Sequence, residues 1–156
     1  ITGSAPAPWI KGFTERAGLV AGIRGVDTSR LTSTPDPALL AEWSVLKTQV
    51  EGMRMRFVRG STELQADASA QLAAAMLRAL ELGRMLDRSL TFEVQGWSDE
   101  GGSERRNLEL RARRAQLLRE SLLAAGVPAQ SLASGADDPA PTRPSASVLW
   151  IESVAP

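Results

Sequence analysis

Strand-like and helix-like patterns follow one another in a fixed order over the last two thirds of this 156-residue chain. Residues 53–57 and 90–95 alternate apolar and polar side chains, as strands with one buried face do. Residues 66–82 and 104–125 carry the spacing of long helices, and 148–151 form a last apolar strand. This order predicts an α/β (α+β) fold, a β-α-β-α-β sandwich. Because helices connect its strands, we expect a mixed sheet with its helices packed on one face.

Glycine and proline mark where the two long helices are expected to end. Gly83 is placed to cap the first, and Gly126 the second, with Pro128 just beyond. Leu132 lies in a short connecting segment, and a Pro-rich loop follows at residues 138–144. These positions predict where the chain turns back toward the sheet.

Three parts are expected along the chain. Residues 53–156 form the main domain, and 36–52 form a linker helix that packs on it. Asp36 is its expected N-cap, because Pro37 then occupies the first helical position. Residues 1–35 form a small unit that is too short to fold alone.

The small unit is expected to start with a turn. Residues 3–8 contain the glycine and prolines of a short turn, and residues 9–21 place apolar side chains at helical spacing. Because the sequence starts without methionine, we expect a piece of a longer protein, with a signal or anchor upstream.

The composition excludes several kinds of chemistry. The chain contains no His and no Cys, which removes the imidazole base, the thiolate nucleophile and the usual zinc and copper ligands. These absences exclude a serine triad, a cysteine protease and a zinc hydrolase, and we expect no metal and no cofactor. The abundant Asp and Glu could support hydrolysis in principle, but no carboxylate pair is singled out by motif or spacing, so no enzyme is expected. The 18 Lys and Arg balance 18 Asp and Glu, so no overall field attracts nucleic acid, which is not expected as a partner.

One loop and the helix after it carry the most specific pattern. The loop contains Gly96-x-Ser98-Asp99, and the helix places Asn107, Leu110, Arg114 and Ala115 at fixed spacing. The segment resembles the OmpA-like peptidoglycan-binding family, found in outer-membrane protein A, peptidoglycan-associated lipoprotein and motor-stator proteins. Further matches lie outside this segment: Phe57, Gly60, Ser61, Leu64, Gly126, Val127, Pro128, Leu132 and Gly135.

The resemblance implies a ligand and the residues that bind it. OmpA-like domains bind the diaminopimelate residue of the peptidoglycan stem peptide through an Asp and an Arg, which correspond to Asp99 and Arg114. An Asp can accept from the ammonium group of this zwitterion, and the planar fork of an Arg can pair with its carboxylate. Four residues are expected in support: Ser98, Asn107, Leu110 and Gly101.

Two other interpretations of this pair remain open. An Asp in a loop and an Arg on a helix more often form a surface ion pair worth under about 1 kcal/mol. The chain could also be a degenerate OmpA-like module that acts as a protein-protein or assembly scaffold. The chain departs from the family at Ser98 in place of Thr, Arg111 in place of Ser, and Ser145-Ala146-Ser147 in place of Asn-Arg-Arg.

The other arginines of this helix are expected on its wet face. They are interleaved with glutamates, which favours pairing between residues four apart. The set comprises Arg105, Arg106, Arg111, Arg113 and Arg119. Trp97 is expected to lie partly buried beside the strand end, with a sugar-stacking role as the alternative.

The resemblance also implies a location and further partners. We expect a periplasmic, cell-envelope protein that binds peptidoglycan and anchors an upstream membrane-associated or envelope domain to the cell wall. An absent upstream region would connect it to the outer membrane, and a homodimer is left open. Residues 1–35 show a short resemblance to the end of a BON-like module.

Asp99→Ala and Arg114→Ala are expected to abolish binding to peptidoglycan, while the thermal stability of the chain stays nearly unchanged.

Overall fold

The computed structural model describes residues 1–23, 25–57, 62, 66–98, 103–135 and 145–154. Internal contacts divide the chain into two compact units, Ile1–Glu42 and Trp43–Pro156. The predicted boundaries at residues 35 and 52 stay a prediction.

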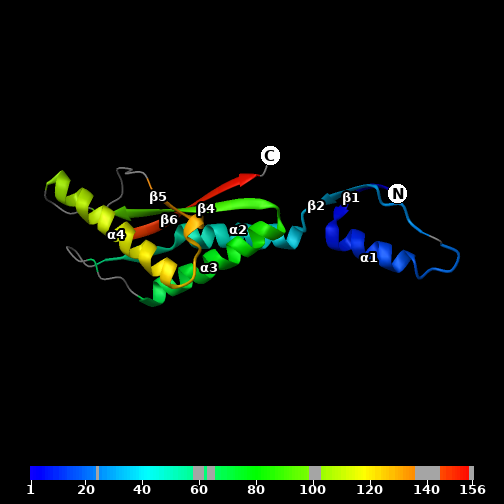
Figure 1. Ribbon diagram of the computed structural model, residues 1–156, viewed down its shortest axis with the longest axis horizontal. Coiled ribbons are helices and arrows are strands. Elements are labelled where there is room, and N and C mark those ends of the chain that lie inside the picture. Colours follow the sequence, from blue (N-terminus) through cyan, green and yellow to red (C-terminus); the bar gives the residue numbers. More distant parts are fainter. Residues whose placement is uncertain (24, 58–61, 63–65, 99–102, 136–144, 155–156) are drawn as a thin grey trace. The chain divides into compact units, whose positions relative to one another are not determined.

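A four-stranded mixed sheet forms the centre of the second unit (Figure 1). Its strands are β3 (Arg54–Arg56), β4 (Arg88–Trp97), β5 (Leu132–Ser134) and β6 (Ser145–Val154), in the order β3-β6-β4-β5. β4 runs parallel to β5 and antiparallel to β6, which also pairs antiparallel with β3. The predicted mixed sheet is therefore confirmed, and the segment around Leu132 is itself an edge strand.

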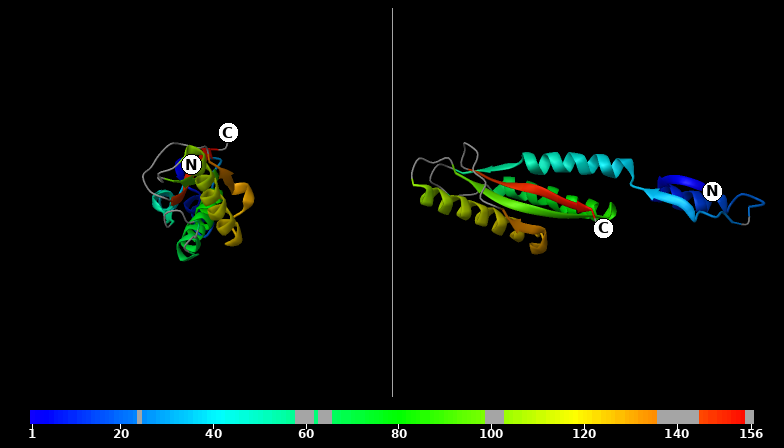
Figure 2. Two further views of the ribbon diagram at one scale, coloured as in Figure 1. Left: turned by 90° about the vertical axis from the view of Figure 1, so that its left-hand side faces the viewer. Right: turned by 90° about the horizontal axis from the view of Figure 1, so that it is seen from above.

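Helices cover one face of this sheet (Figure 2). They are α2 (Pro37–Gly52), α3 (Ala66–Met85) and α4 (Glu104–Ala124), followed by the short 3-10 helix η1 (Ala129–Ser131). Both α3 and α4 pack on β4, and α4 also packs on β6. Within the described residues, no helix has the combined length and apolar character needed to cross a membrane.

The ends of the helices follow the sequence signals in part. The Asp36 carboxylate accepts from the Ala38 amide at 2.8 Å at the start of α2, as expected of an N-cap. Gly126 adopts φ +94° after α4, a conformation that glycine adopts without strain. Gly83 is not a cap, because α3 continues past it to Met85.

Two neighbouring groups leave little room for a side chain at Gly83. A Cβ there would lie 3.4 Å from the Trp43 ring and 3.0 Å from the Arg88 carbonyl oxygen. Close packing of α3 against α2 and β4 therefore explains the glycine, and its expected role as a cap was wrong.

The core is built on aromatic contacts across the sheet and helices. Phe92 and Trp150 are partners on β4 and β6, with ring centroids 5.7 Å apart, and Trp43 of α2 meets Trp150 edge-to-face at 4.7 Å. The Trp150 indole nitrogen is buried without a hydrogen-bond partner among the described residues. Fully buried aliphatic side chains complete the core: Val50, Leu72, Met76, Leu82, Leu118 and Leu122.

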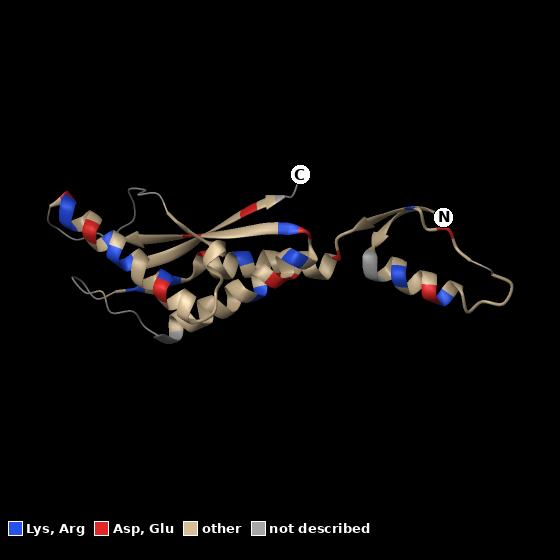
Figure 3. Cartoon of the chain, in the orientation of Figure 1, with Lys and Arg blue, Asp and Glu red and all other residues tan. Residues whose placement is uncertain are grey.

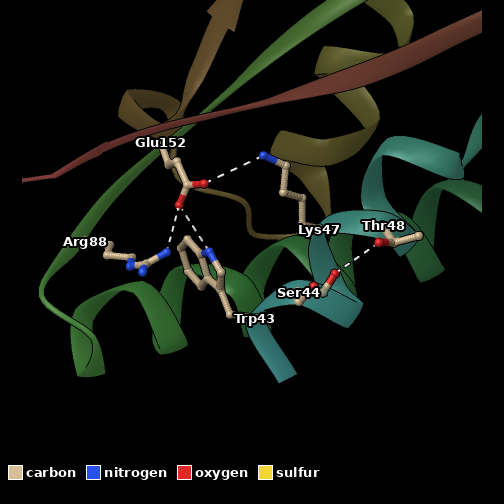
Figure 4. A network of polar contacts seen from close by, with 6 residues as sticks. All are labelled: Trp43, Ser44, Lys47, Thr48, Arg88 and Glu152. Atoms are coloured by element: carbon tan, nitrogen blue, oxygen red, sulfur yellow. Dashed lines mark hydrogen bonds and ion pairs between the residues drawn. The ribbon is translucent and has the colours of Figure 1, made fainter. Parts of the chain in front are cut away.

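A carboxylate joins α2 to the start of β4 and the end of β6 (Figure 4). Glu152 accepts from the Trp43 indole at 3.1 Å and from Arg88 at 3.2 Å, and Lys47 lies 3.6 Å away. About a third of the Glu152 side chain is exposed. This cluster, the Glu152 network, fastens the linker helix to the sheet.

The first unit contains a parallel pair of strands joined through one helix. β1 (Thr2–Pro6) pairs with β2 (Arg30–Thr34), and α1 (Ala7–Ala17) lies between them in sequence. The turn expected at residues 3–8 is wrong, because pairing with a distant strand outweighs the local glycine and proline signals. Hydrogen bonds from Ser29 hold the pKa of the Asp27 carboxyl below its usual value just before β2.

Candidate functional site

The end of β4 lies unusually close to the first half of α4. A Cβ at Gly96 would stand 2.0 Å from the Arg111 carbonyl oxygen and 2.9 Å from the Ala115 amide nitrogen. A distance this short to backbone atoms excludes every residue except glycine without movement of the helix. The glycine of the motif therefore sets the distance between strand and helix, and the small Ala115 faces it.

Arg114 is buried at this junction, with none of its surface exposed. Its Nη1 donates to the Trp97 carbonyl oxygen at 2.9 Å, and its guanidinium carbon lies 5.3 Å from the centroid of the Phe57 ring. Burial of an arginine costs several kcal/mol unless hydrogen bonds and favourable charges compensate. The site thus holds a positive charge in a position that packing alone does not favour.

Two of the expected supporting residues meet beside Arg114. The Ser98 hydroxyl donates to the Asn107 side-chain oxygen at 3.3 Å, which links the strand end to the first turn of α4. Ser98 is buried, whereas Asn107 and Leu110 are half-buried. The structure brings Ser98, Asn107 and Arg114 to one junction, while Asp99 and Gly101 lie outside the described residues.

Trp97 is half-buried, as expected, and its partner lies on β6. Its indole nitrogen donates to the Ser147 hydroxyl at 2.9 Å. Ser145, Ala146 and Ser147, which we expected in place of the family's Asn-Arg-Arg, are buried at the start of β6. The departure therefore replaces charged side chains with a small, buried hydrogen-bonding surface.

Sequence reasoning missed the partners of this junction. Phe57 was expected on the first strand, but nothing in its alternation indicated that its ring would face Arg114. Ser147 was noted only as a departure from the family. In the observed register Trp97 pairs with Ser145. A sequence-based prediction of this register would have placed Ser147 and the end of β3 near Trp97.

The arginines of α4 divide into two groups. Acidic and basic residues are interspersed along the helix (Figure 3), and Arg105 pairs with Glu109 at 3.2 Å on the exposed face, as expected. Arg106 and Arg113 are also exposed. Arg111 and Arg119 are instead half-buried, so their assignment to the wet face was wrong.

The charged group at the junction is the guanidinium of Arg114. A guanidinium presents five N–H donors in a planar fork suited to a carboxylate. Among the described residues, no group of three His, Cys, Asp or Glu side chains could hold a metal ion. The junction therefore offers donors for an anion.

The β4–α4 junction lies within a match to a known protein family. The model of the OmpA family matches residues 56–148, which include the β4–α4 junction. No curated protein sequence matches the chain.

The fold is shared with a solved structure, and two further structures are similar to a lesser degree. The peptidoglycan-associated lipoprotein from Burkholderia pseudomallei is similar with a TM-score of 0.50 and 21% identity, over 64% of this chain and 90% of that one. The OmpA-like domain of FopA1 from Francisella tularensis subsp. tularensis SCHU S4 follows, with a TM-score of 0.49, 13% identity and coverages of 65% and 71%. The periplasmic domain of Helicobacter pylori MotB has a TM-score of 0.41, 15% identity and coverages of 67% and 77%.

Proposed function

Because the chain belongs to the OmpA family, we propose that it binds peptidoglycan non-covalently, through the diaminopimelate residue of the stem peptide. The family generally binds peptidoglycan and is not enzymatic, so the expectation that the chain is no enzyme is confirmed. In this proposal Asp99 accepts from the ammonium group of the ligand and Arg114 pairs with its carboxylate.

One observation carries the proposal: an arginine is placed at the strand-helix junction by several specific contacts. The Trp97 carbonyl orients the guanidinium, the Phe57 ring lies under it, and the bond between Ser98 and Asn107 ties the loop start to the helix. An oriented guanidinium loses little conformational entropy when it pairs with a carboxylate.

The proposed setting is the bacterial periplasm. There the domain would tether an upstream membrane-associated or envelope domain, with an outer-membrane connection, to the cell wall. The FopA1 and lipoprotein structures resemble this chain in fold only, so location and anchoring belong to the proposal.

A titration of the intact chain with two stem peptides tests the proposal. One peptide contains diaminopimelate, and the other contains lysine, which lacks the carboxylate on the side chain. We expect binding of the first and at least tenfold weaker binding of the second, because a charge-assisted pair contributes about 1.5–3 kcal/mol. No response to the diaminopimelate peptide at millimolar concentration would favour the scaffold.

Variants assign the interaction to residues. Asp99→Asn and Arg114→Lys should each weaken retention on purified peptidoglycan, because the first removes a charge and the second removes the planar fork. Arg113→Gln is the matched control, since Arg113 is exposed on the same helix. Retention that is unchanged in both site variants would contradict the assignment. Binding should also weaken as salt rises.

The scaffold remains the alternative, and one observation favours it. Arg114 has no exposed surface, and neither Arg114 nor its contacts Phe57 and Trp97 line the cavity between α4 and β5 or the cavity beside η1. If the chain binds no stem peptide but Arg114→Ala still lowers its stability, Arg114 has a structural role and the scaffold is supported.

A further inference from the structure

A cavity beside α4 adjoins the β4–α4 junction, although Arg114 itself does not line it. The cavity, of about 290 Å³, is enclosed by α4 and by the ends of β4 and β5. Because β4 and β5 are parallel, their carboxyl ends meet here, where open α/β sheets commonly bind ligands. This volume lies just below the range of about 300–1,000 Å³ that is typical of ligand pockets, so only a small group fits.

The described wall of this cavity is positively charged. Arg111 and Arg119 contribute guanidinium groups, and no described lining residue carries a carboxylate. Two glutamates are each engaged by a lining glutamine: Gln95 donates to Glu93 at 2.8 Å, and Gln116 donates to Glu120 at 2.8 Å. The Glu93 carboxylate lies beside the lining Gly135, where a Cβ would be 2.9 Å from its Oε1. The cavity therefore favours an anionic group.

The two arginines have different roles. Arg119 donates to the Leu132 carbonyl oxygen at 2.7 Å, which holds the edge strand β5 against α4. Arg111 is half-buried and makes no hydrogen bond or ion pair with the part of the chain that the structure describes. A guanidinium that has lost part of its hydration without gaining a partner is stabilised by an incoming anion.

We propose that this cavity is a subsite for a second carboxylate of the stem peptide, with Arg111 as its main ligand. The inference rests on the proposed function. Gly96 and Ala115, which are adjacent in sequence to Trp97 and Arg114, line this cavity, so the cavity adjoins the junction and one bound peptide can reach both places. The residue before diaminopimelate in the stem is a glutamate whose α-carboxylate is free, and this group is the one the cavity takes.

A pair of tripeptides tests the subsite by calorimetry. Both are Ala-γ-Glu-diaminopimelate, and they differ only in whether the glutamate α-carboxylate is free or amidated. The intact chain should bind the free form about five- to tenfold more tightly, as expected for one charge-assisted pair that is partly screened. Arg111→Gln should remove this preference, and Arg111→Lys should retain part of it.

The controls separate this inference from the proposed function. Arg113→Gln removes the same charge from the exposed face and should keep the full preference. Asp99→Asn should weaken both peptides by the same factor. Equal binding of the two peptides by the unaltered chain would overturn the subsite and leave the proposed function intact. Failure to bind either peptide would overturn the proposed function, and the subsite with it.

Discussion

The two ends of β4 each hold a charged side chain, but they hold it in opposite ways. At the start of the strand, Glu152 is about a third exposed and has three donors around it from α2 and Arg88. At the end of the strand, Arg114 is fully buried beside the Trp97 carbonyl and the Phe57 ring.

The difference separates a structural contact from a candidate for function. A partly exposed carboxylate loses little hydration, and its ion pairs contribute up to about 1 kcal/mol each. The Glu152 network is therefore a structural contact that can be altered at a small cost in stability. A buried guanidinium costs far more to place, and a hydrophobic residue there would cost less. The end of β4 therefore holds a charge at a cost in stability, which proteins accept at functional sites and which agrees with the proposed ligand-binding role of Arg114.

Gly96→Ala should have the largest effect, because it pushes α4 away from the end of β4. The new Cβ would stand 2.0 Å from the Arg111 carbonyl oxygen, so the free energy of unfolding should fall by at least about 3 kcal/mol. Urea denaturation measures this. Gly52→Ala is the control, because a Cβ there meets nothing within 4 Å and should leave stability unchanged or raise it slightly. Equal effects of the two substitutions would refute the close approach.

Arg114→Ala should lower the free energy of unfolding by about 2–4 kcal/mol, since it leaves a cavity and an unpaired Trp97 carbonyl. The burial replaces the sequence-based expectation that this variant keeps its thermal stability. Arg113→Ala should stay within about 0.5 kcal/mol, as exposed substitutions usually do. If Arg114→Ala leaves the free energy of unfolding unchanged, the charge at the end of β4 is no more costly to bury than the one at its start, and the comparison fails.

Glu152→Gln should cost about 1 kcal/mol, because it removes the ion pairs to Arg88 and Lys47 but keeps an acceptor for the Trp43 indole. The comparison variant is Glu81→Gln, which breaks one exposed ion pair with Arg78 and should change stability by less than about 0.5 kcal/mol. The cost of Glu152→Gln should shrink in high salt. A cost above that of Arg114→Ala would reverse the comparison.

Trp150→Phe should have the smallest effect, under about 1 kcal/mol, although Trp150 lies in the core midway between the two ends. The substitution loses buried ring area, which destabilises the fold. It also removes a buried indole N–H that has no partner among the described residues, and this gain in stability offsets much of the loss. Trp43→Phe should cost more, because that indole donates to Glu152. Thermal unfolding of both variants checks the order, and a larger loss at Trp150 would indicate a partner for its indole.

Much of the fold could be predicted from local patterns. The alternation at residues 53–57 and 90–95 identified β3 and β4, and Asp36 and Gly126 marked two helix ends. The errors share a cause. Gly83, residues 3–8 and β5 were misjudged because contacts with distant parts of the chain decided their conformation.

The residues of the candidate site could be predicted from the sequence, but the burial and the contacts of their side chains could not. The spacing of Ser98, Asn107 and Arg114 indicated one junction, which the structure contains. The roles of Asp99 and Arg114 as ligands stay a prediction. Nothing in the sequence indicated that Arg111 would face a cavity, because its neighbours in sequence resemble those of the exposed Arg113.

The sequence by itself determined the order of elements, the absence of imidazole and thiol chemistry, and the motif at the β4–α4 junction. Periodicity and spacing are properties of short segments, so they can be recognised without a structure. Only the tertiary structure decided which arginine of α4 is buried, which lines a cavity and which stays in water. That depends on how closely Gly96 lets the helix approach the sheet, a distance that no local pattern encodes.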